Sequence, residues 1–516
     1  MRTPYSQYLL ALLTVSFTVW GSILAVSLAR CVRTEKSIRL VHWVLLGAVL
    51  AVGIGLRFFW MPHQFRVFYD GYEIVNLSKN IADRQSFSQC RGGTLDDCEL
   101  EIMPSRPPAF SVLGAAAMKL SGLRTPEVIF SLNSLIGVLC IGMMFLLVFC
   151  VTRDAGGALL AAAMTAVLPL HIKMSSNASS EMFNFLLVCS MLYFLHQFLK
   201  SGALLQFTGM AASIHLAFFN RTENMLFLVL LPLAIFTFTD RQIRARVIQY
   251  FFHGWVLIIA SIIPLIDMFL NIHYIHMGHM ELFYTKAPVE TLIRNIIYLC
   301  GNDYVPFAIV GPALAGMALL WTKASFTAKL MAAQFLINFV VISLVNVGLW
   351  IGDFPRLLIG MTVTLFFWAA LSVSQVARQC GPRRVTAAFG VYLVLLLAGM
   401  NMKPPPFHVY IKYHEAVLRK FIPEVPSECS FYAPNPEMFF VYTGNRAYRI
   451  RELLDEAFMA RHKECKILVR EVLCSSSYRK LCEAVSKKYP QKIIYRHDVS
   501  KSRAFIISEI LEKDRK

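Results

Sequence analysis

Charged residues are scarce in this sequence. They make up 16% of its 516 residues, whereas 56% are hydrophobic. A soluble domain carries about 25% charged residues, so the composition argues against an ordinary soluble protein. Apolar runs long enough to cross a hydrocarbon core of ~30 Å recur along the chain and stop near residue 402. The sequence therefore predicts a membrane domain over 1–401 and a soluble domain over 402–516.

Several sequence motifs are also missing. The net charge is +18, but no long basic tract with interleaved aromatic residues occurs, which argues against a nucleic-acid partner. No C-x-x-C pair is present, so a zinc knuckle is disfavoured. The part after residue 402 has no glycine-rich phosphate loop, which favours a binding or lid role for it. The N-terminal apolar run is too long for a cleaved signal peptide and no A-x-A site follows it.

Twelve apolar segments are predicted to span the membrane. They are 7–29, 40–60, 126–151, 155–171, 181–199, 203–219, 225–239, 248–270, 303–321, 329–350, 356–377 and 384–401. Lys and Arg residues gather in alternate connections, including 30–39, 241–246 and 378–384, so we expect that side to be cytoplasmic. The loop 61–125 and the C-terminal domain are then exoplasmic.

Cysteines agree with this assignment. Of twelve, six lie in or beside the predicted spans or in cytoplasmic turns. The other six are exoplasmic: Cys90, Cys98, Cys429, Cys465, Cys474 and Cys482. An even number in each exoplasmic part is typical of disulfides in an oxidising compartment. Cys90–Cys98 is the favoured pair, and the pairings in the C-terminal domain stay open.

The C-terminal domain is predicted to be a small α/β domain. EMFFVYT follows a proline and ends at Gly444, as a helix does. KILVREVL and KIIYRHD have the composition of strands, and a further helix is expected to end near Lys488. The fold class is thus an all-α polytopic membrane domain with a small exoplasmic α/β domain.

Loop 61–125 is too long and too patterned for a connector. Tyr72, Val75 and Ile81 lie at roughly helical spacing, so a helix is expected to begin just after Asp70. In one interpretation Asp70 caps this helix and Glu73 completes a capping box. In the other, Asp70 is a general base at the membrane surface.

Several segments resemble the C-type membrane glycosyltransferases, in the branch of the protein O-mannosyltransferases and the lipid A aminoarabinose transferase. The resembling segments occur in family order: FYDGYEIVNLSKNIADRQSFS, RPPAFSVLGAAAMKLSG, SSEMFNFLL, RTENMLFLVLLPL and FPRLLIGMTVTLF. The first predicted span departs from the common family pattern. The resemblance implies transfer of a sugar, with inversion, from a polyprenyl-phosphate carrier to an acceptor on the exoplasmic face.

The resemblance also implies residue roles. Asp70 matches the family's catalytic aspartate, and Glu181 matches an acidic position that binds sugar or metal. The alternative for Glu181 is an ordinary helix-start carboxylate. Candidate phosphate ligands are Arg106, Arg221 and Arg356, each of which is otherwise an interfacial arginine. Weaker sugar or metal candidates are Glu73 and Glu223.

Three histidines, His273, His276 and His279, recur at every third position. They are metal candidates, although interfacial histidines are the favoured explanation. The sequence establishes no cofactor and leaves a divalent metal as a candidate.

A transporter or flippase of a lipid-linked saccharide is the main alternative function, and a non-catalytic scaffold is another. Transporters carry internal repeats and ionisable residues deep in their spans, and neither is evident here. We therefore expect a transferase whose partners are a polyprenyl-phosphate sugar and membrane lipid. The sequence leaves the sugar and the acceptor open. The lack of a retention signal favours the bacterial plasma membrane.

Overall fold

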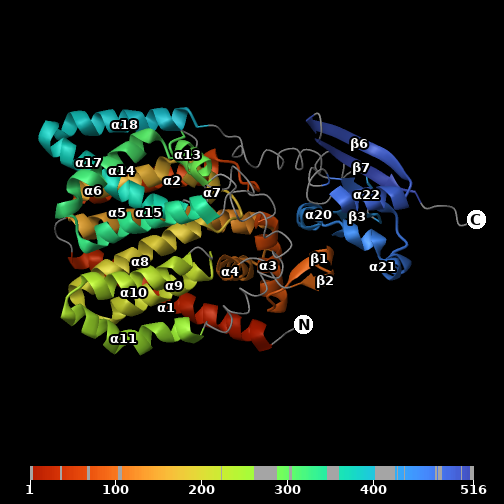
Figure 1. Cartoon of the computed structure of the whole chain (residues 1–516), viewed down its shortest axis with the longest axis horizontal. Coiled ribbons are helices and arrows are strands. Elements are labelled where there is room, and N and C mark those ends of the chain that lie inside the picture. Colours follow the sequence, from red (N-terminus) through yellow and green to blue (C-terminus); the bar gives the residue numbers. More distant parts are fainter. Residues whose placement is uncertain are drawn as a thin grey trace, which may run out of the picture.

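The protein has two parts along its longest axis, a bundle of helices and a mixed α/β part (Figure 1). The computed structural model describes residues 4–34, 38–66, 70–102, 107–221, 224–260, 288–301, 305–345, 359–400, 425–426, 428–434, 436–470, 474, 479–500 and 503–511.

The bundle is built from the following elements. Before the first large loop lie α1 (Pro4–Thr34), α2 (Leu40–Ile54) and the π-helix η1 (Gly55–Trp60). The loop contributes α3 (Asp70–Arg84), β1 (Gln89–Gly93), β2 (Cys98–Ile102) and α4 (Ala109–Ser121). Then come α5 (Pro126–Thr152), α6 (Ala155–Val167), α7 (Pro169–Ser175), α8 (Glu181–Ser201), α9 (Leu204–Phe218), α10 (Met225–Phe238) and α11 (Arg241–Ala260). The last are α13 (Pro288–Leu299), α14 (Phe307–Leu320), η4 (Trp321–Lys323), α15 (Phe326–Val345), η5 (Ile359–Met361), α17 (Thr362–Cys380) and α18 (Pro382–Ala398).

Each predicted span coincides with a helix or a pair of consecutive helices, as far as the described residues reach. Five described helices are long and apolar enough to cross a membrane, or six if α6 and α7, bent by 58°, form one broken span. The bundle also contains shorter apolar helices, among them α9, α14 and α15. The chain is therefore a multi-pass membrane protein, while the count of twelve stays a prediction.

The predicted cytoplasmic connections gather at one end of the bundle. Three contacts join them: Arg246 Nη1 to Ser201 O (3.1 Å), Lys200 Nζ to Cys150 O (3.3 Å) and Arg378 Nη2 to Asp154 Oδ2 (3.1 Å). The α/β part lies at the opposite end of the bundle (Figure 1). This arrangement fits the prediction that the basic connections and the C-terminal domain face opposite sides of the membrane.

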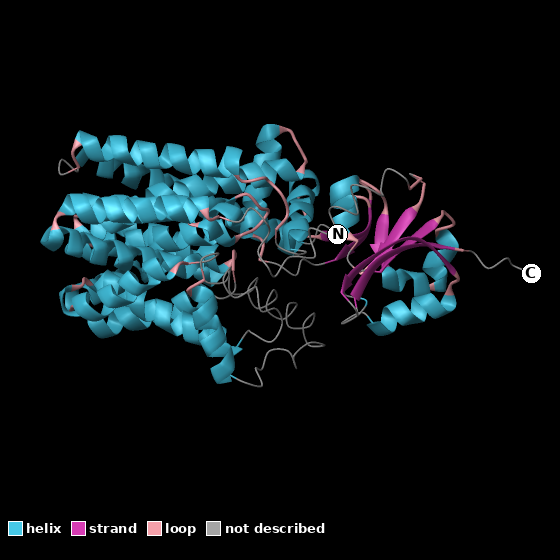
Figure 2. Cartoon of the chain, turned by 90° about the horizontal axis from the view of Figure 1, so that it is seen from above, coloured by secondary structure: helices cyan, strands magenta, loops and turns pink. Residues whose placement is uncertain are grey.

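The C-terminal domain contains a sheet with helices on both faces (Figure 2). Its elements are β3 (Ser430–Ala433), α20 (Glu437–Thr443), β4 (Ala447–Arg449), η8 (Ile450–Leu454), α21 (Glu456–Arg461), β5 (Lys466–Arg470), α22 (Arg479–Lys488), β6 (Gln491–Ser500) and β7 (Arg503–Ile510). The strand order is β2-β1-β4-β3-β5-β7-β6, so the sheet also includes the hairpin of the first large loop. Pairing is antiparallel except between β3 and its two neighbours. The loop and the C-terminal domain thus share one sheet.

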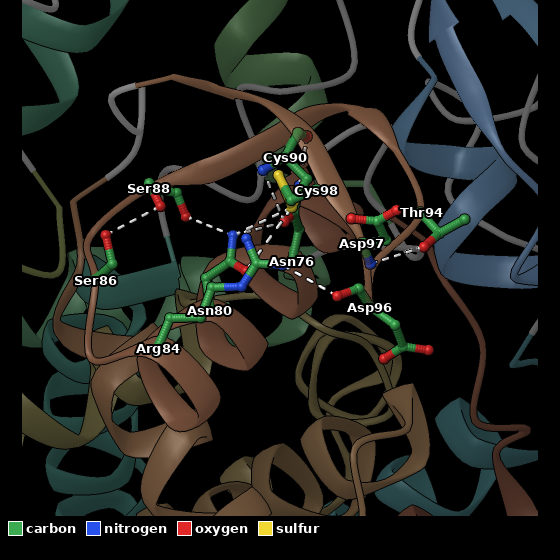
Figure 3. The surroundings of a disulfide bond; sticks show 10 residues. All are labelled: Asn76, Asn80, Arg84, Ser86, Ser88, Cys90, Thr94, Asp96, Asp97 and Cys98. Carbon is green, nitrogen blue, oxygen red and sulfur yellow. Dashed lines mark hydrogen bonds between the residues drawn. A yellow bond between two sulfur atoms is a disulfide. The ribbon is translucent and has the colours of Figure 1, made fainter. Parts of the chain in front are cut away.

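The hairpin β1–β2 is fixed to α3 beneath it. Asn76 exchanges two hydrogen bonds with the backbone of Cys90, donating to its carbonyl (2.8 Å) and accepting from its N–H (3.1 Å), as Figure 3 shows. Asn80 donates to the carbonyl of Ser88 at 2.8 Å. Gly93, at φ +94°, allows the tight turn, because a side chain there would meet the Asp97 carbonyl oxygen.

Disulfides join Cys90 to Cys98, the pair favoured by the sequence, and also Cys429 to Cys465 and Cys474 to Cys482. Among the other cysteines whose side chains are described, Cys140, Cys150 and Cys189 are buried thiols, Cys300 is half-buried and Cys380 is exposed.

Removing the Cys90–Cys98 disulfide is expected to loosen the hairpin. The bond closes a loop with a sequence separation of 8 residues. By loop entropy, its loss costs roughly 2–3 kcal/mol. The double variant Cys90→Ser/Cys98→Ser should show faster hydrogen exchange in β1 and β2. Cys474–Cys482 has the same separation of 8 residues, so its double serine variant is the matched control and should leave exchange in the hairpin unchanged. Equal exchange in β1 and β2 for both variants would contradict this expectation.

Candidate functional site

Asp70 is the first residue of α3, as the spacing predicts, and is 9% exposed. The turn that follows it is tightly packed. A methyl group added at Gly71 would lie 2.6 Å from Phe65 Cδ1 and 3.1 Å from the carbonyl oxygen of Ala178. The rings of Phe65 and Tyr72 are 4.3 Å apart. The backbone at Asp70 therefore packs against the segment that follows α7.

Residues 176–179 of that segment are buried, and polar contacts hold them in place. Asn177 Oδ1 accepts a hydrogen bond from the backbone N–H of Arg66 at 2.9 Å. Asn133 Nδ2 donates to the carbonyl of Asn177 at 2.7 Å, and Gln64 N–H donates to the carbonyl of Ser176 at 3.2 Å. These bonds fix residues 176–178 beside residues 64–66, which precede Asp70 in the chain.

Glu181, at the start of α8, forms an ion pair with Arg221. Arg221 Nη1 lies 3.0 Å from Glu181 Oε1, and the two side chains are 11% and 2% exposed. A second link runs beside it, because Asn220 Nδ2 donates to the carbonyl of Ser180 at 3.0 Å. The motifs SSEMFNFLL and RTENMLFLVLLPL are therefore side by side at one end of the bundle.

The two remaining motifs reach the same place. The backbone N–H of Ala109, in RPPAF, donates to the carbonyl of Phe219 at 2.9 Å. A methyl group added at Gly360, four residues after Arg356, would lie 2.7 Å from Asn184 Nδ2. Asn184 Oδ1 in turn accepts from Asn224 Nδ2 at 2.7 Å. All five family-like segments thus converge where Asp70, Glu181 and Arg221 lie.

The structure describes four of the predicted site residues, namely Asp70, Glu73, Glu181 and Arg221. The others lie outside the described residues: Arg106, Glu223, His273, His276, His279 and Arg356. Within the described part of the chain, no group of three or more His, Cys, Asp or Glu side chains is placed to hold a metal ion.

Glu73 faces the hairpin and the C-terminal domain. Arg91 Nη2 lies 3.0 Å from Glu73 Oε1, and Arg91 Nη1 pairs with Glu437 of α20. Burial raises the pKa of Glu437; the charge of Arg91 opposes the rise and that of Glu73 adds to it. Neither Arg91 nor Glu437 stands out in the sequence, since 346 residues separate them.

Two amide groups at the site were also missed by sequence reasoning. Asn177 Nδ2 and Asn220 Oδ1 are buried and have no hydrogen-bond partner among the described residues. Buried polar atoms are nearly always paired, so orphaned atoms call for an explanation. In the sequence, both lie beside the family-like motifs and each begins an N-x-S/T pattern, at 177–179 and 220–222.

An apolar cavity of about 520 Å³ opens between α8, α10 and α15. Its lining includes Met191, Phe227, Leu231, Leu330 and Ala333. Phe227 lies within one helical turn of Asn224, so the cavity begins near the family-like motifs. It extends to Trp321, Phe326 and Lys329, in and beside the connection between α14 and α15. Its size falls within the ~300–1,000 Å³ of ligand pockets.

Residues 105–266 match the family model described as "Dolichyl-phosphate-mannose-protein mannosyltransferase". This stretch contains the motifs around Arg106, Glu181 and Arg221 and begins after Asp70. No curated protein matches the chain by sequence.

Solved structures share the fold at low sequence identity. The oligosaccharyltransferase of Archaeoglobus fulgidus, in its apo form, aligns with a TM-score of 0.55 and 12% identity, covering 93% of this chain and 75% of that one. ArnT from Cupriavidus metallidurans bound to undecaprenyl phosphate aligns with a TM-score of 0.55 and 13% identity, covering 91% of this chain and 98% of that one. The archaeal enzyme AglB has also been solved with an inhibitory peptide and a dolichol-phosphate, at a TM-score of 0.54 and 12% identity over 90% of this chain and 74% of that one. These matches extend over both the bundle and the α/β part.

Proposed function

We propose that this chain is a C-type membrane glycosyltransferase that transfers a sugar from a polyprenyl-phosphate carrier to an acceptor, with inversion at the anomeric carbon. The family match over residues 105–266 and the shared fold support this proposal. The observation that carries the proposal is that the turn beginning at Asp70 packs against Ala178, three residues before Glu181, which pairs with Arg221. An apolar cavity lies between the helices that follow these residues. A carboxylate, a cation and an apolar groove are the parts that this reaction needs.

Asp70 is the proposed general base. As the acceptor's hydroxyl or amine attacks the anomeric carbon, its proton passes to the Asp70 carboxylate. The bond between the anomeric carbon and the phosphate oxygen breaks on the opposite face, which inverts the configuration. The buried first turn of α3 supports this role, because a fixed backbone keeps the carboxylate oriented.

Arg221 is the proposed ligand of the leaving phosphate. Negative charge grows on the phosphate oxygen as the bond breaks, and a fixed guanidinium stabilises it. The ion pair with Glu181, at 3.0 Å, would keep the arginine in place. Arg106 and Arg356 remain proposed as further phosphate ligands. Glu223 and Glu73 are weaker candidates for binding the sugar or a metal. His273, His276 and His279 are weaker candidates for binding a metal.

The sugar is proposed to bind beside the orphaned amides. Asn177 offers an unpaired N–H donor and Asn220 an unpaired carbonyl acceptor, and sugar hydroxyls can pair with both. A small local rearrangement would be needed for contact, because both atoms are buried.

The isoprenoid tail is proposed to lie in the cavity between α10 and α15. Filling the cavity by Ala333→Trp should raise the KM for long-chain donors about tenfold or more. Losing about 60 Å² of apolar contact, at roughly 25 cal/mol per Å², corresponds to about 1.5 kcal/mol. Leu336→Trp is the control, because Leu336 lies on the same helix, is 53% exposed and does not line the cavity. Equal KM values for both variants, measured with carriers of several lengths, would contradict this placement.

We propose that the reaction takes place at the exoplasmic face of a bacterial plasma membrane, with loop 61–125 and the C-terminal domain outside. The partners are then the lipid-linked donor, the surrounding membrane lipid and an acceptor whose class the site leaves open. The basic connections at the opposite end of the bundle support this orientation.

The experiment is a transfer assay on the purified full-length chain with a panel of polyprenyl-phosphate sugars and of nucleotide sugars. The proposal expects product from at least one lipid-linked donor, with the opposite anomeric configuration by NMR. Product formed only from a nucleotide sugar, or with retained configuration, would overturn it.

A further inference from the structure

Three charged side chains meet where the first large loop, the hairpin and the C-terminal domain come together. They are Glu73 of α3, Arg91 of β1 and Glu437 of α20. The guanidinium of Arg91 forms ion pairs with both carboxylates: Nη2 lies 3.0 Å from Glu73 Oε1, and Nη1 pairs with Glu437. The side chains are 7%, 9% and 3% exposed for Arg91, Glu73 and Glu437. We call these three residues the buried triad.

Burial of this kind makes the triad interdependent. A buried charge without a partner is costly, so removal of one member changes the position or the protonation of the others. Arg449 also acts on Glu437, and its charge, like that of Arg91, lowers the pKa that burial raises. Because its three members come from α3, β1 and α20, the triad forms only when β1 and α20 pack against α3.

The position of the triad on α3 connects it to Asp70. Glu73 follows Asp70 by three residues, which places both on one face of the first helical turn. Further along α3, Asn76 and Asn80 bind the hairpin backbone. The ion pair of Arg91 with Glu73 joins the hairpin to the first turn of α3, and that of Arg91 with Glu437 joins the hairpin to the C-terminal domain.

We propose that Glu437 is a positioning residue for Asp70: through Arg91 and Glu73 the C-terminal domain holds the first turn of α3 in its reactive orientation. The catalytic part of this inference rests on the proposed function. The C-terminal domain, which has no phosphate-binding loop of its own, would then contribute to catalysis by orienting a residue of the membrane site.

The first test is Glu437→Gln, which removes the charge and keeps the size. It should lower kcat by about tenfold to 100-fold, because small misplacements of a reacting group have effects of this order. The KM for the donor should change less than twofold, since the tail and phosphate sites are untouched. Glu437→Asp, which restores the charge, should recover part of kcat.

The second test does not depend on activity. Hydrogen exchange in residues 70–76 should become faster in Glu437→Gln than in the wild type. Arg446→Gln is the matched control. Arg446 Nε lies 3.5 Å from Glu99 Oε1, so it also joins the hairpin to the C-terminal domain, but the pair is 43% and 26% exposed and does not reach α3. Its kcat and its exchange in residues 70–76 should match the wild type.

The outcomes separate the two proposals. Wild-type kcat and unchanged exchange in Glu437→Gln would overturn the positioning role, whatever happens to thermal stability. An equal loss of kcat in Arg446→Gln would overturn it too, because any weakening of the sheet would then suffice. A wild-type protein that transfers no sugar would contradict the proposed function, while faster exchange in Glu437→Gln would still support the coupling of the C-terminal domain to α3.

Discussion

Replacement of Asp70 by asparagine is expected to lower kcat by about 10²- to 10⁴-fold, the range that a general base contributes. Asparagine has nearly the same shape but cannot accept the acceptor's proton. Donor binding should persist, because the proposed phosphate and tail sites do not involve Asp70. The measurement is kcat for sugar transfer together with the Kd for the lipid-linked donor.

Asp83→Asn provides the matched control for Asp70→Asn. Asp83 lies near the other end of α3, is 35% exposed and pairs with Lys79 and Arg124. The same chemical change on the same helix should therefore leave kcat within about twofold, since partly exposed ion pairs contribute little. Full activity of Asp70→Asn would remove Asp70 as the base and return it to the role of a helix cap.

Replacement of Arg221 by methionine is expected to lower kcat by about 10²- to 10³-fold, the effect of losing one donor to a developing oxyanion. The substitution also leaves Glu181, 2% exposed, as a buried carboxylate without its cation. Stability should therefore fall by roughly 3–5 kcal/mol. Both kcat and the midpoint of thermal unfolding need to be measured.

The double variant Arg221→Met/Glu181→Met separates the two effects of Arg221→Met. Replacing a buried ion pair by apolar side chains is often neutral for stability, so the double variant should regain most of the lost thermal stability. It should remain as inactive as the single variant. Recovery of activity along with stability would show that Arg221 acts only through folding. Arg124→Met, at a partly exposed arginine paired with Asp83, is the control and should retain activity.

The helices and the order of the motifs could be predicted from the sequence because their signals are local. A long apolar run or a repeat near 3.6 residues is contained in one segment, and α3 accordingly begins at Asp70. The number of membrane crossings is harder to predict. Helix α10 has only 14 residues and contains Pro232, so its length alone does not identify a full crossing.

The shared sheet could not be predicted, because its pairing joins distant parts of the chain. Gly93 of β1 lies opposite Ala447 of β4, and nothing local to either strand specifies the other. The buried triad has the same origin, since Arg91 and Glu437 are 346 residues apart. The Glu181–Arg221 pair spans 40 residues, and sequence reasoning identified both members separately without predicting that they would bind each other.

The most direct test of the central claim uses proteoliposomes that contain the full-length protein, an acceptor pool and polyprenyl phosphate carrying a radiolabelled sugar. Release of free polyprenyl phosphate is measured together with labelled acceptor and with the intact donor in each leaflet. The proposed transferase predicts that carrier and labelled acceptor appear in equal amounts, and that the rate of both falls by about 10²- to 10⁴-fold in Asp70→Asn. Movement of intact donor between leaflets without its cleavage would contradict the account and identify a transporter instead.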